Sequence, residues 1–302
     1  MIRVITDSTS SISAATAKEL GIQVITLFVN HNGVEHEDAT MDLEAFYSQI
    51  YQMINNIPRS SQPSQLAFES AFEEAARAGD QVLGLFMSSG LSGTFEGALR
   101  AARSVAARNA SFTYALVDTQ SCGYDEGWPV IAAAQARNQG LSLMECVEVA
   151  KRSVCSTRFL FAPESLTFLQ KGGRIGRASA LLGNLVKITP VLTVRDGTVL
   201  TAAKVRTQKK AMARILELLK EDMDRCGLKN IKAHYIGLKE PAAKWAREHI
   251  DPLVGFSVDV VPVSPVVGLH VGPAVGIAYE CCSPLDGKMV EAQVPVVLSA
   301  TC

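Results

Sequence analysis

The first half of the chain repeats one pattern, in which a short apolar run is followed by a polar turn and then by a helical segment. The apolar runs at residues 2–5, 83–87 and 114–117 are each followed directly by serine, threonine or aspartate. Alternation of strand and helix is typical of a parallel sheet that helices cover on both faces. We therefore predict an N-terminal α/β domain over residues 1–157, with a further strand at residues 22–29.

Polar side chains follow these strands where each strand ends. In open parallel sheets, ligands lie beyond the carboxyl ends of the strands, which is where Asp7, Ser92 and Asp118 would gather. Ser60 belongs to a second hydroxyl-rich stretch, in which Pro63 disfavours helix at the preceding residue and suits the first turn of the next helix. We expect Ser60 to lie in an extended segment near the same edge of the sheet.

After residue 157 the strict alternation ends, and strands and helices mix. Asp196 and Gly197 form an Asp-Gly turn, which is typical of a hairpin between strands at residues 188–194 and 198–201. His270 lies in a glycine-rich stretch, residues 268–276, that we interpret as a loop. These patterns predict an α+β C-terminal domain over residues 158–302, with helices from residue 162 and at 178–185, 208–226 and 241–250, and strands at 231–238, 258–263 and 295–300.

Composition excludes several classes of function. The 302 residues are 48% hydrophobic and 20% charged, which is enough apolar material for two globular cores. The 29 Lys and Arg residues nearly balance the 30 Asp and Glu residues, and no long basic run is present, so nucleic acid is not an expected partner. The sequence shows neither a signal peptide nor an apolar run of membrane-spanning length, and we expect a cytoplasmic protein with at most transient membrane contact.

Cysteine and histidine usage indicates neither disulfides nor a metal centre. The seven cysteines are an odd number without CxxC spacing, so we expect free thiols. His36 lies within the acidic stretch at residues 35–38, but no second cluster of ligand residues accompanies it. We expect a solvated loop at residues 35–38 and no bound metal.

The stretch at residues 88–94, SSGLSGT, places hydroxyls and free backbone N–H groups at the start of a helix, where a carboxylate or phosphate oxygen is favoured. The alternative is that Ser92 or Thr94 only caps its own helix, which is the commoner use of these residues. The second glycine comes one position too early for the nucleophile elbow of a serine hydrolase, and no P-loop or dinucleotide fingerprint is present. Uncharged hydroxyls in an apolar chain suit an amphiphile with a small acidic head.

Six short motifs resemble those of the DegV family, in its order and across nearly the whole chain: residues 5–10 (ITDSTS), 60–64 (SSQPS), 88–94 (SSGLSGT), 169–176 (LQKGGRIG), 204–207 (KVRT) and 270–273 (HVGP). The family is known as bacterial fatty-acid-binding proteins of two α/β domains, and some members present the fatty acid to a separate fatty acid kinase. The resemblance implies a non-catalytic carrier of a long-chain fatty acid, without a cofactor. It also implies that the acyl chain is buried in a cavity of the N-terminal domain that opens near the domain interface.

The resemblance implies roles for individual residues as well. Ser60 and Ser92 match the hydroxyls that hold the carboxylate, although the family usually has threonine at position 60. Arg206 and His270 match positions near the carboxylate end of the ligand. Arg174 matches a surface arginine that engages the kinase.

Two alternatives remain open at this point. One is an enzyme that acts on a small acyl or phosphorylated substrate through Ser92 and His270, and the other is a regulatory protein that acts through the basic turn at residues 171–177. If the protein is a carrier, apolar residues on helix faces are candidates for the lining around the acyl chain, although such faces more often pack in the protein core. The candidates are Leu66, Phe68, Phe72, Leu99 and Ile131.

Overall fold

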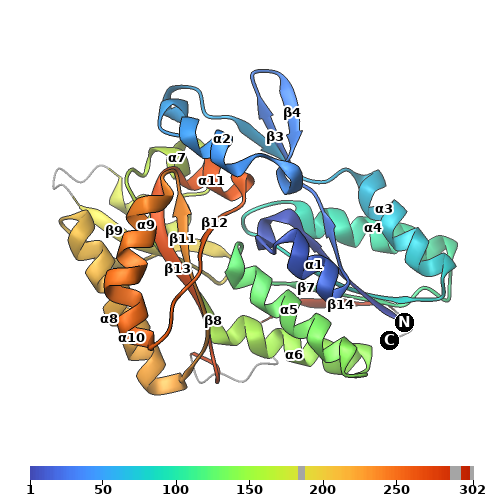
Figure 1. The fold of residues 1–302 in the computed structure, drawn as a ribbon. Coiled ribbons are helices and arrows are strands. Elements are labelled where there is room, and N and C mark those ends of the chain that lie inside the picture. Colours follow the sequence, from blue (N-terminus) through green and yellow to red (C-terminus); the bar gives the residue numbers. More distant parts are fainter. Residues whose placement is uncertain (183–187, 286–293, 300–302) are drawn as a thin grey trace.

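The computed structural model describes residues 1–182, 188–285 and 294–299, and its strands form three sheets (Figure 1). The first sheet contains β1 (Ile2–Asp7), β2 (Ile22–Ile25), β6 (Gln81–Phe86), β7 (Tyr114–Asp118) and β14 (Val296–Leu298). The strand order is β14–β7–β6–β1–β2, and all neighbours except β14 and β7 are parallel. The predicted parallel sheet of the first half is therefore present.

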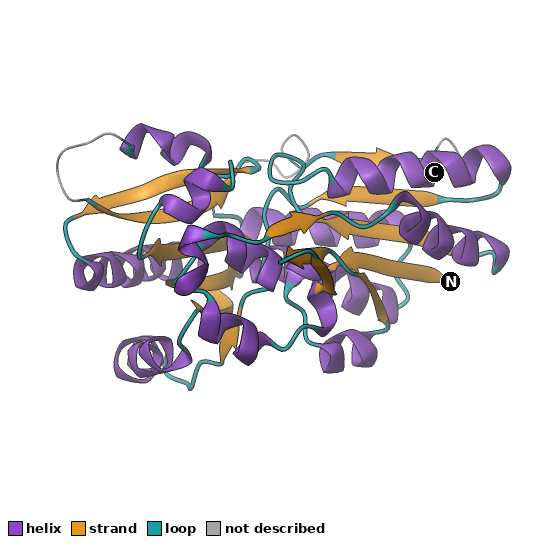
Figure 2. Cartoon of the chain, turned by 90° about the horizontal axis from the view of Figure 1, so that it is seen from above, coloured by secondary structure: helices purple, strands orange, loops and turns teal. Residues whose placement is uncertain are grey.

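Helices cover both faces of this sheet, as the alternation of the sequence predicts (Figure 2). α3 (Gln65–Arg77) and α4 (Thr94–Arg108) pack on one face through a core that includes Phe68 and Phe72. The other face is covered by α1 (Ala14–Leu20), α5 (Tyr124–Asn138) and α6 (Leu143–Ser156). α6 was not among the predicted helices. Because helices cover both faces, we look for a ligand site at the edges of this sheet.

The second half is built on a six-stranded mixed sheet in the order β10–β9–β8–β13–β11–β12, formed by β8 (Thr157–Pro163), β9 (Thr189–Arg195), β10 (Thr198–Val205), β11 (Leu228–Ile236), β12 (Val260–Pro262) and β13 (Ala274–Cys281). β9 and β10 form the predicted hairpin, with positive φ at Asp196 and Gly197. One face is covered by α8 (Gln208–Cys226), α9 (Lys239–Trp245) and α10 (Asp251–Val254). The opposite face packs toward the first half.

A three-stranded antiparallel sheet consists of β3 (Phe28–His31), β4 (Val34–Glu37) and β5 (Arg59–Ser61). With α2 (Leu43–Gln49), α7 (Thr167–Lys171) and α11 (Pro265–Val271), it lies at the top of Figure 1, above the junction of the two halves. Leu27, Tyr47, Phe168 and Leu269 bring these elements into one core cluster. This layer contributes to the candidate site from both parts of the chain.

Four predicted elements are wrong, and one of them is the solvated loop expected at residues 35–38, which consists of part of strand β4 and the buried Asp38. The strand predicted at residues 22–29 is two strands in different sheets, because the Ser8 hydroxyl accepts the Leu27 N–H and Leu27 lies between β2 and β3. The helix predicted from residue 162 begins only at Thr167, since β8 continues to Pro163 in its pairing with β13. The loop predicted at residues 268–276 is the end of α11 and the start of β13.

The remaining predicted elements are present with shifted ends. The segment predicted as a helix at 178–185 contains a 3₁₀ helix at Gly176–Leu181, and residues 183–185 lie outside the described residues. The strand predicted at 295–300 is β14, which pairs with β7, while residue 300 lies outside the described residues. The end of the chain therefore returns to the sheet of the first half, across the predicted boundary at residue 157.

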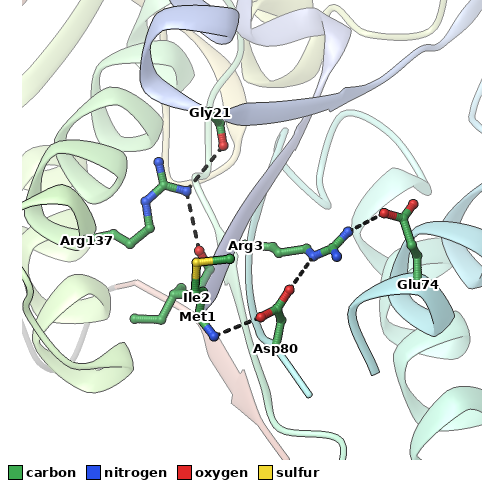
Figure 3. Close-up of polar contacts among 7 residues, drawn as sticks. All are labelled: Met1, Ile2, Arg3, Gly21, Glu74, Asp80 and Arg137. Carbon is green, nitrogen blue, oxygen red and sulfur yellow. Dashed lines mark hydrogen bonds and ion pairs between the residues drawn. The ribbon is translucent and has the colours of Figure 1, made fainter. Parts of the chain in front are cut away.

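A cluster of charges links the amino ends of the first-half strands (Figure 3). The Met1 ammonium nitrogen and Arg3 Nε each lie 2.8 Å from a different oxygen of Asp80, and Arg3 Nη1 lies 2.6 Å from Glu74 Oε1. Arg137, on α5, donates to backbone carbonyl groups of β1 and of the turn after α1. These contacts join β1, α3, α5 and the start of β6 at the edge opposite the carboxyl ends of the strands.

Candidate functional site

A cavity of about 330 Å³ lies between the two halves, beyond the carboxyl end of β6. Its apolar walls come from both halves and include Met87, Leu91, Cys122, Phe159, Phe161 and Val267. Its polar lining residues are Ser60, Ser61, Gln62, Ser92, Arg174 and His270. A mostly apolar concavity with a few convergent polar groups is typical of a small-molecule site.

The residues that helix faces predict as tail-lining candidates lie outside this cavity. Phe68 and Phe72 are fully buried in the core beneath α3 and α4, and Leu99 and Ile131 pack against core clusters. Leu66 is 72% exposed. None of the five is among the residues that line the cavity. Their helices are occupied by packing against the sheet, so the cavity lies between the halves rather than within the first half.

Ser60 and His270 meet at the polar end of the cavity. Ser60 lies on β5 opposite Val29 of β3, and its Oγ lies 2.8 Å from His270 Nε2 on α11. The segment around Ser60 is extended, as the following proline predicts. His270 packs closely on Gly172, where an added Cβ would lie 2.5 Å from the imidazole Nδ1. Burial lowers the pKa of His270 to about 4, and the charge of Arg174 acts in the same direction, so the imidazole is neutral at pH 7.

Ser92 lines the same cavity from the loop between β6 and α4. Its Oγ lies 2.8 Å from Thr94 Oγ1 and accepts the Thr94 N–H at 3.3 Å. The N-cap of α4 is Gly93, so Ser92 forms a hydroxyl turn just before the helix rather than its cap, and it also lines the cavity.

Two aspartates at the ends of strands hold this loop. Asp7, at the end of β1, accepts the Met87 N–H at 2.9 Å, and Asp118, at the end of β7, accepts the Ser89 hydroxyl at 2.6 Å. The Ser88 hydroxyl donates to the carbonyl of Gly197 in the β9–β10 turn at 2.9 Å. Asp7, Asp118 and the loop of Ser92 thus gather at one edge of the sheet, as predicted.

The structure places the two predicted arginines differently. Arg174 is exposed and lines the cavity, where its guanidinium donates to the carbonyls of Leu91 and Gly172 at 3.2 and 2.7 Å. Arg206 is exposed just beyond the end of β10 and is not a lining residue. Six residues of mostly extended chain, roughly 20 Å, separate Arg206 from Val199 in the cavity wall. The structure brings together Ser60, Ser92, Arg174 and His270, and leaves Arg206 outside this group.

The geometry does not pair Ser92 with His270, as the alternative of an enzyme requires. His270 bonds to Ser60, whereas Ser92 bonds to Thr94. His270 Nδ1 is buried and has no hydrogen-bond partner among the described residues, so no carboxylate orients the imidazole as in a catalytic triad. Within the same residues, no group of three or more His, Cys, Asp or Glu side chains is placed to hold a metal ion.

Asp38 is an organising residue that the sequence analysis missed. Residues 35–37 are exposed in β4, in agreement with a solvated segment, but Asp38 is only 4% exposed. Its carboxylate accepts the Ser264 hydroxyl at 2.8 Å and the Val266 N–H at 2.9 Å, at the start of α11. Burial raises the pKa of Asp38, and these hydrogen bonds partly offset the rise. Asp38 thereby fixes the helix that carries His270, through a contact that no local pattern indicates.

A second buried acid supports Asp7. The Thr9 hydroxyl lies 2.6 Å from Asp7 Oδ1 and 2.9 Å from Glu126 Oε2. Burial raises the pKa of Glu126 well above its ordinary value, and the nearby Asp7 carboxylate raises it further. Because Thr9 has one hydroxyl proton for two acceptors, a protonated Glu126 supplies the second proton of this network. The network fixes β1 against α5 directly behind the Ser92 loop.

Across residues 1–182, 188–285 and 294–299, no helix is both long enough and apolar enough to cross a bilayer. The fold and the site together define an α/β protein with a mostly apolar cavity between two sheets, whose polar lining consists of serine hydroxyls, the Gln62 amide, the His270 imidazole and the Arg174 guanidinium. A family model described as "Uncharacterised protein, DegV family" matches residues 1–281. A DegV domain-containing protein of Clostridium acetobutylicum is 36% identical over 284 residues, which are 92% of this chain and 97% of the relative. The chain belongs to the DegV family.

Solved structures of this family share the fold. A DegV family protein from Thermus thermophilus, described as fatty-acid binding, is 31% identical with a TM-score of 0.81, and the match covers 93% of this chain and 99% of that one. DegV from Bacillus subtilis, described as a fatty acid binding protein, is 28% identical with a TM-score of 0.80 and the same coverage. The mixed α/β architecture is therefore the architecture of the family.

Proposed function

We propose that this protein binds a long-chain fatty acid, with the acyl chain in the cavity between the halves and the carboxylate held by Ser60 and Ser92. The observation that carries the proposal is a single cavity that combines apolar walls with two hydroxyls at the family's carboxylate-binding positions. The descriptions of the Thermus and Bacillus relatives as fatty-acid-binding proteins support it.

The chemistry of the cavity suits a carrier. Each buried methylene group of an acyl chain contributes about 0.8 kcal/mol, so affinity comes mainly from the tail. Hydrogen bonds from neutral hydroxyls orient the carboxylate but are weaker than an ion pair with a buried cation. Most of the affinity for such a ligand comes from its acyl chain, while its carboxylate is held weakly enough to leave the hydroxyl groups.

We assign His270 the role of orienting the Ser60 hydroxyl. The neutral imidazole carries one proton, and when this proton is on Nε2 the ring donates to Ser60 Oγ. The hydroxyl proton of Ser60 is then free to turn toward the carboxylate. In the same tautomer the buried Nδ1 is an unpaired acceptor rather than an unpaired donor, which is consistent with its lack of a partner among the described residues.

We further propose that the protein is a non-catalytic carrier, without a cofactor, that presents its ligand to a fatty acid kinase. Arg174, Arg59 and Lys171 line a second opening beside Ser60 and His270, so a positive rim surrounds the head of the ligand. This rim supports a partner that approaches the carboxylate from this side. Arg206 is left out of the head-group site because of its distance from the cavity wall. We also propose that the domain boundary lies at residue 157. The large sheets before and after this residue are separate, except that β14 returns to the first sheet.

Mass spectrometry of the bound lipid tests the function. Protein made in bacteria is analysed under native conditions and after solvent extraction, and a fatty acid of defined mass in one-to-one ratio is the expected result. Delipidated protein should rebind the same acid. Delipidated, folded protein that binds no fatty acid would contradict the proposal. Turnover of esters or acyl phosphates by the purified protein would favour the enzyme alternative, since a carrier alone turns over neither.

A further inference from the structure

Two buried carboxylic acids lie behind the wall of the lipid cavity, by which we mean the cavity of the proposed fatty acid site. Asp7 ends β1 and Glu126 lies in the first turn of α5, and both side chains are fully buried. The Glu126 carboxyl is hydrogen-bonded to Asp7, and the Thr9 hydroxyl lies within hydrogen-bond distance of both acids. Two carboxyl groups in contact are a pair that shares its protons.

The titratable groups around this pair are acids and a thiol. Asp38, in the short 3₁₀ helix after β4, acts on Asp7, and the pKa of Cys122, just before α5, is raised by burial and then by Glu126, Asp125 and Asp7. In the described part of the chain, no lysine, arginine or histidine forms an ion pair with either member of the pair. Two ionised carboxylates would therefore face each other here without a compensating cation.

The hydrogen bonds assign one proton to the pair and place it on Glu126. Asp7 accepts three donors: the Thr9 N–H and hydroxyl at 2.9 and 2.6 Å and the Met87 N–H at 2.9 Å. Glu126 contacts the hydroxyls of Thr6 and Thr9 at 3.3 and 2.9 Å. The acid with more donors is the better site for the charge, and a hydrogen bond between two carboxyl groups needs a proton from the other.

The turn that contains Asp7 holds the backbone of two segments that line the lipid cavity. Asp7 accepts the N–H of Met87, which begins the loop of Ser92, and the neighbouring Ser8 hydroxyl accepts the N–H of Leu27. Met87 and Leu27 are both lining residues. A second charge on Glu126 would repel Asp7 and disturb this turn, so the shape of the cavity wall depends on the proton that Glu126 carries.

We propose that Glu126 is a positioning residue of the lipid site, which keeps a proton in the folded protein so that Asp7 can hold Met87 and the loop of Ser92 in place. The effect on fatty acid binding rests on the proposed function, whereas the retained proton does not. Glu126 does not itself line the cavity, so it acts on affinity only through the residues that it supports.

The pH dependence of unfolding tests the proton without any ligand. In the unfolded chain Glu126 ionises near its ordinary pKa of 4.5, whereas Glu126→Gln has a similar shape and never ionises. If the folded wild type retains the proton, its unfolding equilibrium constant should rise relative to that of Glu126→Gln by up to about tenfold for each pH unit above 5. Urea melts between about pH 5 and 8 measure this ratio. Glu19→Gln, at an exposed position of α1, is the matched control and should show no such trend. A ratio that does not change with pH would mean that Glu126 is ionised in the folded protein and overturns the proposal.

Fatty acid affinity at neutral pH tests the positioning. The amide of Glu126→Gln can still donate to Asp7, and delipidated protein with this change should bind a fatty acid within about threefold of wild type. Glu126→Leu has no donor and should weaken binding about tenfold or more. Calorimetry compares the three proteins, with Glu19→Gln again as control. Equal affinity in wild type, Glu126→Gln and Glu126→Leu would overturn the role of Glu126.

The outcomes separate this inference from the proposed function. If Glu126→Leu does not fold, Glu126→Met, which also lacks a donor, takes its place; failure of both to fold would assign Glu126 to the stability of the fold alone and overturn the proposal. A protein that shows the pH-dependent ratio but binds no fatty acid contradicts the proposed function. A protein that binds fatty acid equally well in every variant contradicts only the role of Glu126.

Discussion

Replacing Ser60 by alanine gives the sharpest test of how the carboxylate is held. The Ser60 Oγ lies 2.8 Å from His270 Nε2 at the polar end of the cavity, and in the proposed tautomer, in which Nε2 donates to Oγ, the Ser60 proton is free for a ligand. A hydrogen bond to a charged group is worth about 1.5–3 kcal/mol. Ser60→Ala should therefore weaken fatty acid binding about 10- to 150-fold.

The ligand can be changed in the same experiment. A fatty alcohol of the same chain length keeps the tail and replaces the carboxylate by a neutral hydroxyl, for which a hydrogen bond is worth only about 0.5–1.5 kcal/mol. Affinities of delipidated wild-type and Ser60→Ala protein for the acid and the alcohol complete a double-mutant cycle. We expect Ser60→Ala to lose clearly more affinity for the acid than for the alcohol.

The control is Ser70→Ala, an exposed serine on α3 that does not line the cavity and should leave both affinities unchanged. An equal loss for acid and alcohol would mean that Ser60 affects the shape of the cavity and not the recognition of the carboxylate. Unchanged affinity for the acid would remove Ser60 from the head-group site altogether.

Val267→Trp places a large ring in the apolar wall, and we expect it to abolish long-chain binding at a stability cost of about 1–3 kcal/mol; retained affinity by calorimetry would exclude this cavity as the tail site. Asp80→Ala should lower the free energy of unfolding by about 1–2 kcal/mol at pH 7 by removing the Met1 and Arg3 contacts. These contacts lower the pKa of Asp80, so the difference should vanish as pH falls through that lowered value, and urea melts that show a constant difference would contradict this cause. The pKa of His270 is about 4 in the folded protein, below its ordinary value of 6.5. As the pH falls from 6.5 to 4, the unfolded chain is therefore protonated before the folded protein, and the free energy of unfolding should fall by up to about 3 kcal/mol. His270→Gln should remove that part of the slope, and an unchanged slope would assign it to other groups.

Local physics accounts for the elements that the sequence predicts correctly. The apolar runs of β1, β6 and β7 and the polar turns after them depend on residues within a few positions of each other. Gly21 ends α1 with a φ of 60°, and the Asp196–Gly197 turn forms its hairpin. Such features follow from side-chain and backbone preferences that a short stretch already contains.

The failures depend on contacts between distant residues. Gly268 looks like a loop residue, yet it lies in α11, where an added Cβ would come within 2.5 Å of the Tyr47 hydroxyl oxygen. The start of that helix is held by Asp38, more than 200 positions earlier in the chain. Ser8 likewise fixes the break at Leu27. No local pattern contains these partners, so periodicity alone cannot predict them.

The candidate site likewise combines residues that the sequence predicts with contacts that depend on the fold. Hydroxyl-rich turns at Ser60 and Ser92 are visible in the sequence, and the family resemblance adds Arg174 and His270, all four of which line one cavity. The pairing of Ser60 with His270, rather than of Ser92 with His270, depends on how β5 meets α11. Arg206 matches its motif but lies at the far end of a strand, because a motif fixes sequence position and not distance in space.

The position of the cavity couples ligand binding to the contact between the halves. Phe159 and Phe161 on one side and Met87 on the other line the cavity, and each methylene of an acyl chain bound there would contribute about 0.8 kcal/mol. The polar contacts beside this cavity include the hydrogen bond between Ser60 and His270 and the one from the Arg174 guanidinium to the Leu91 carbonyl. In the proposed complex, the Ser60 hydroxyl would both join β5 to α11 and face the carboxylate of the ligand. A charged pair in its place would bind the carboxylate more firmly and also resist any opening of the halves, whereas a hydroxyl and a neutral imidazole allow the chain to enter and leave.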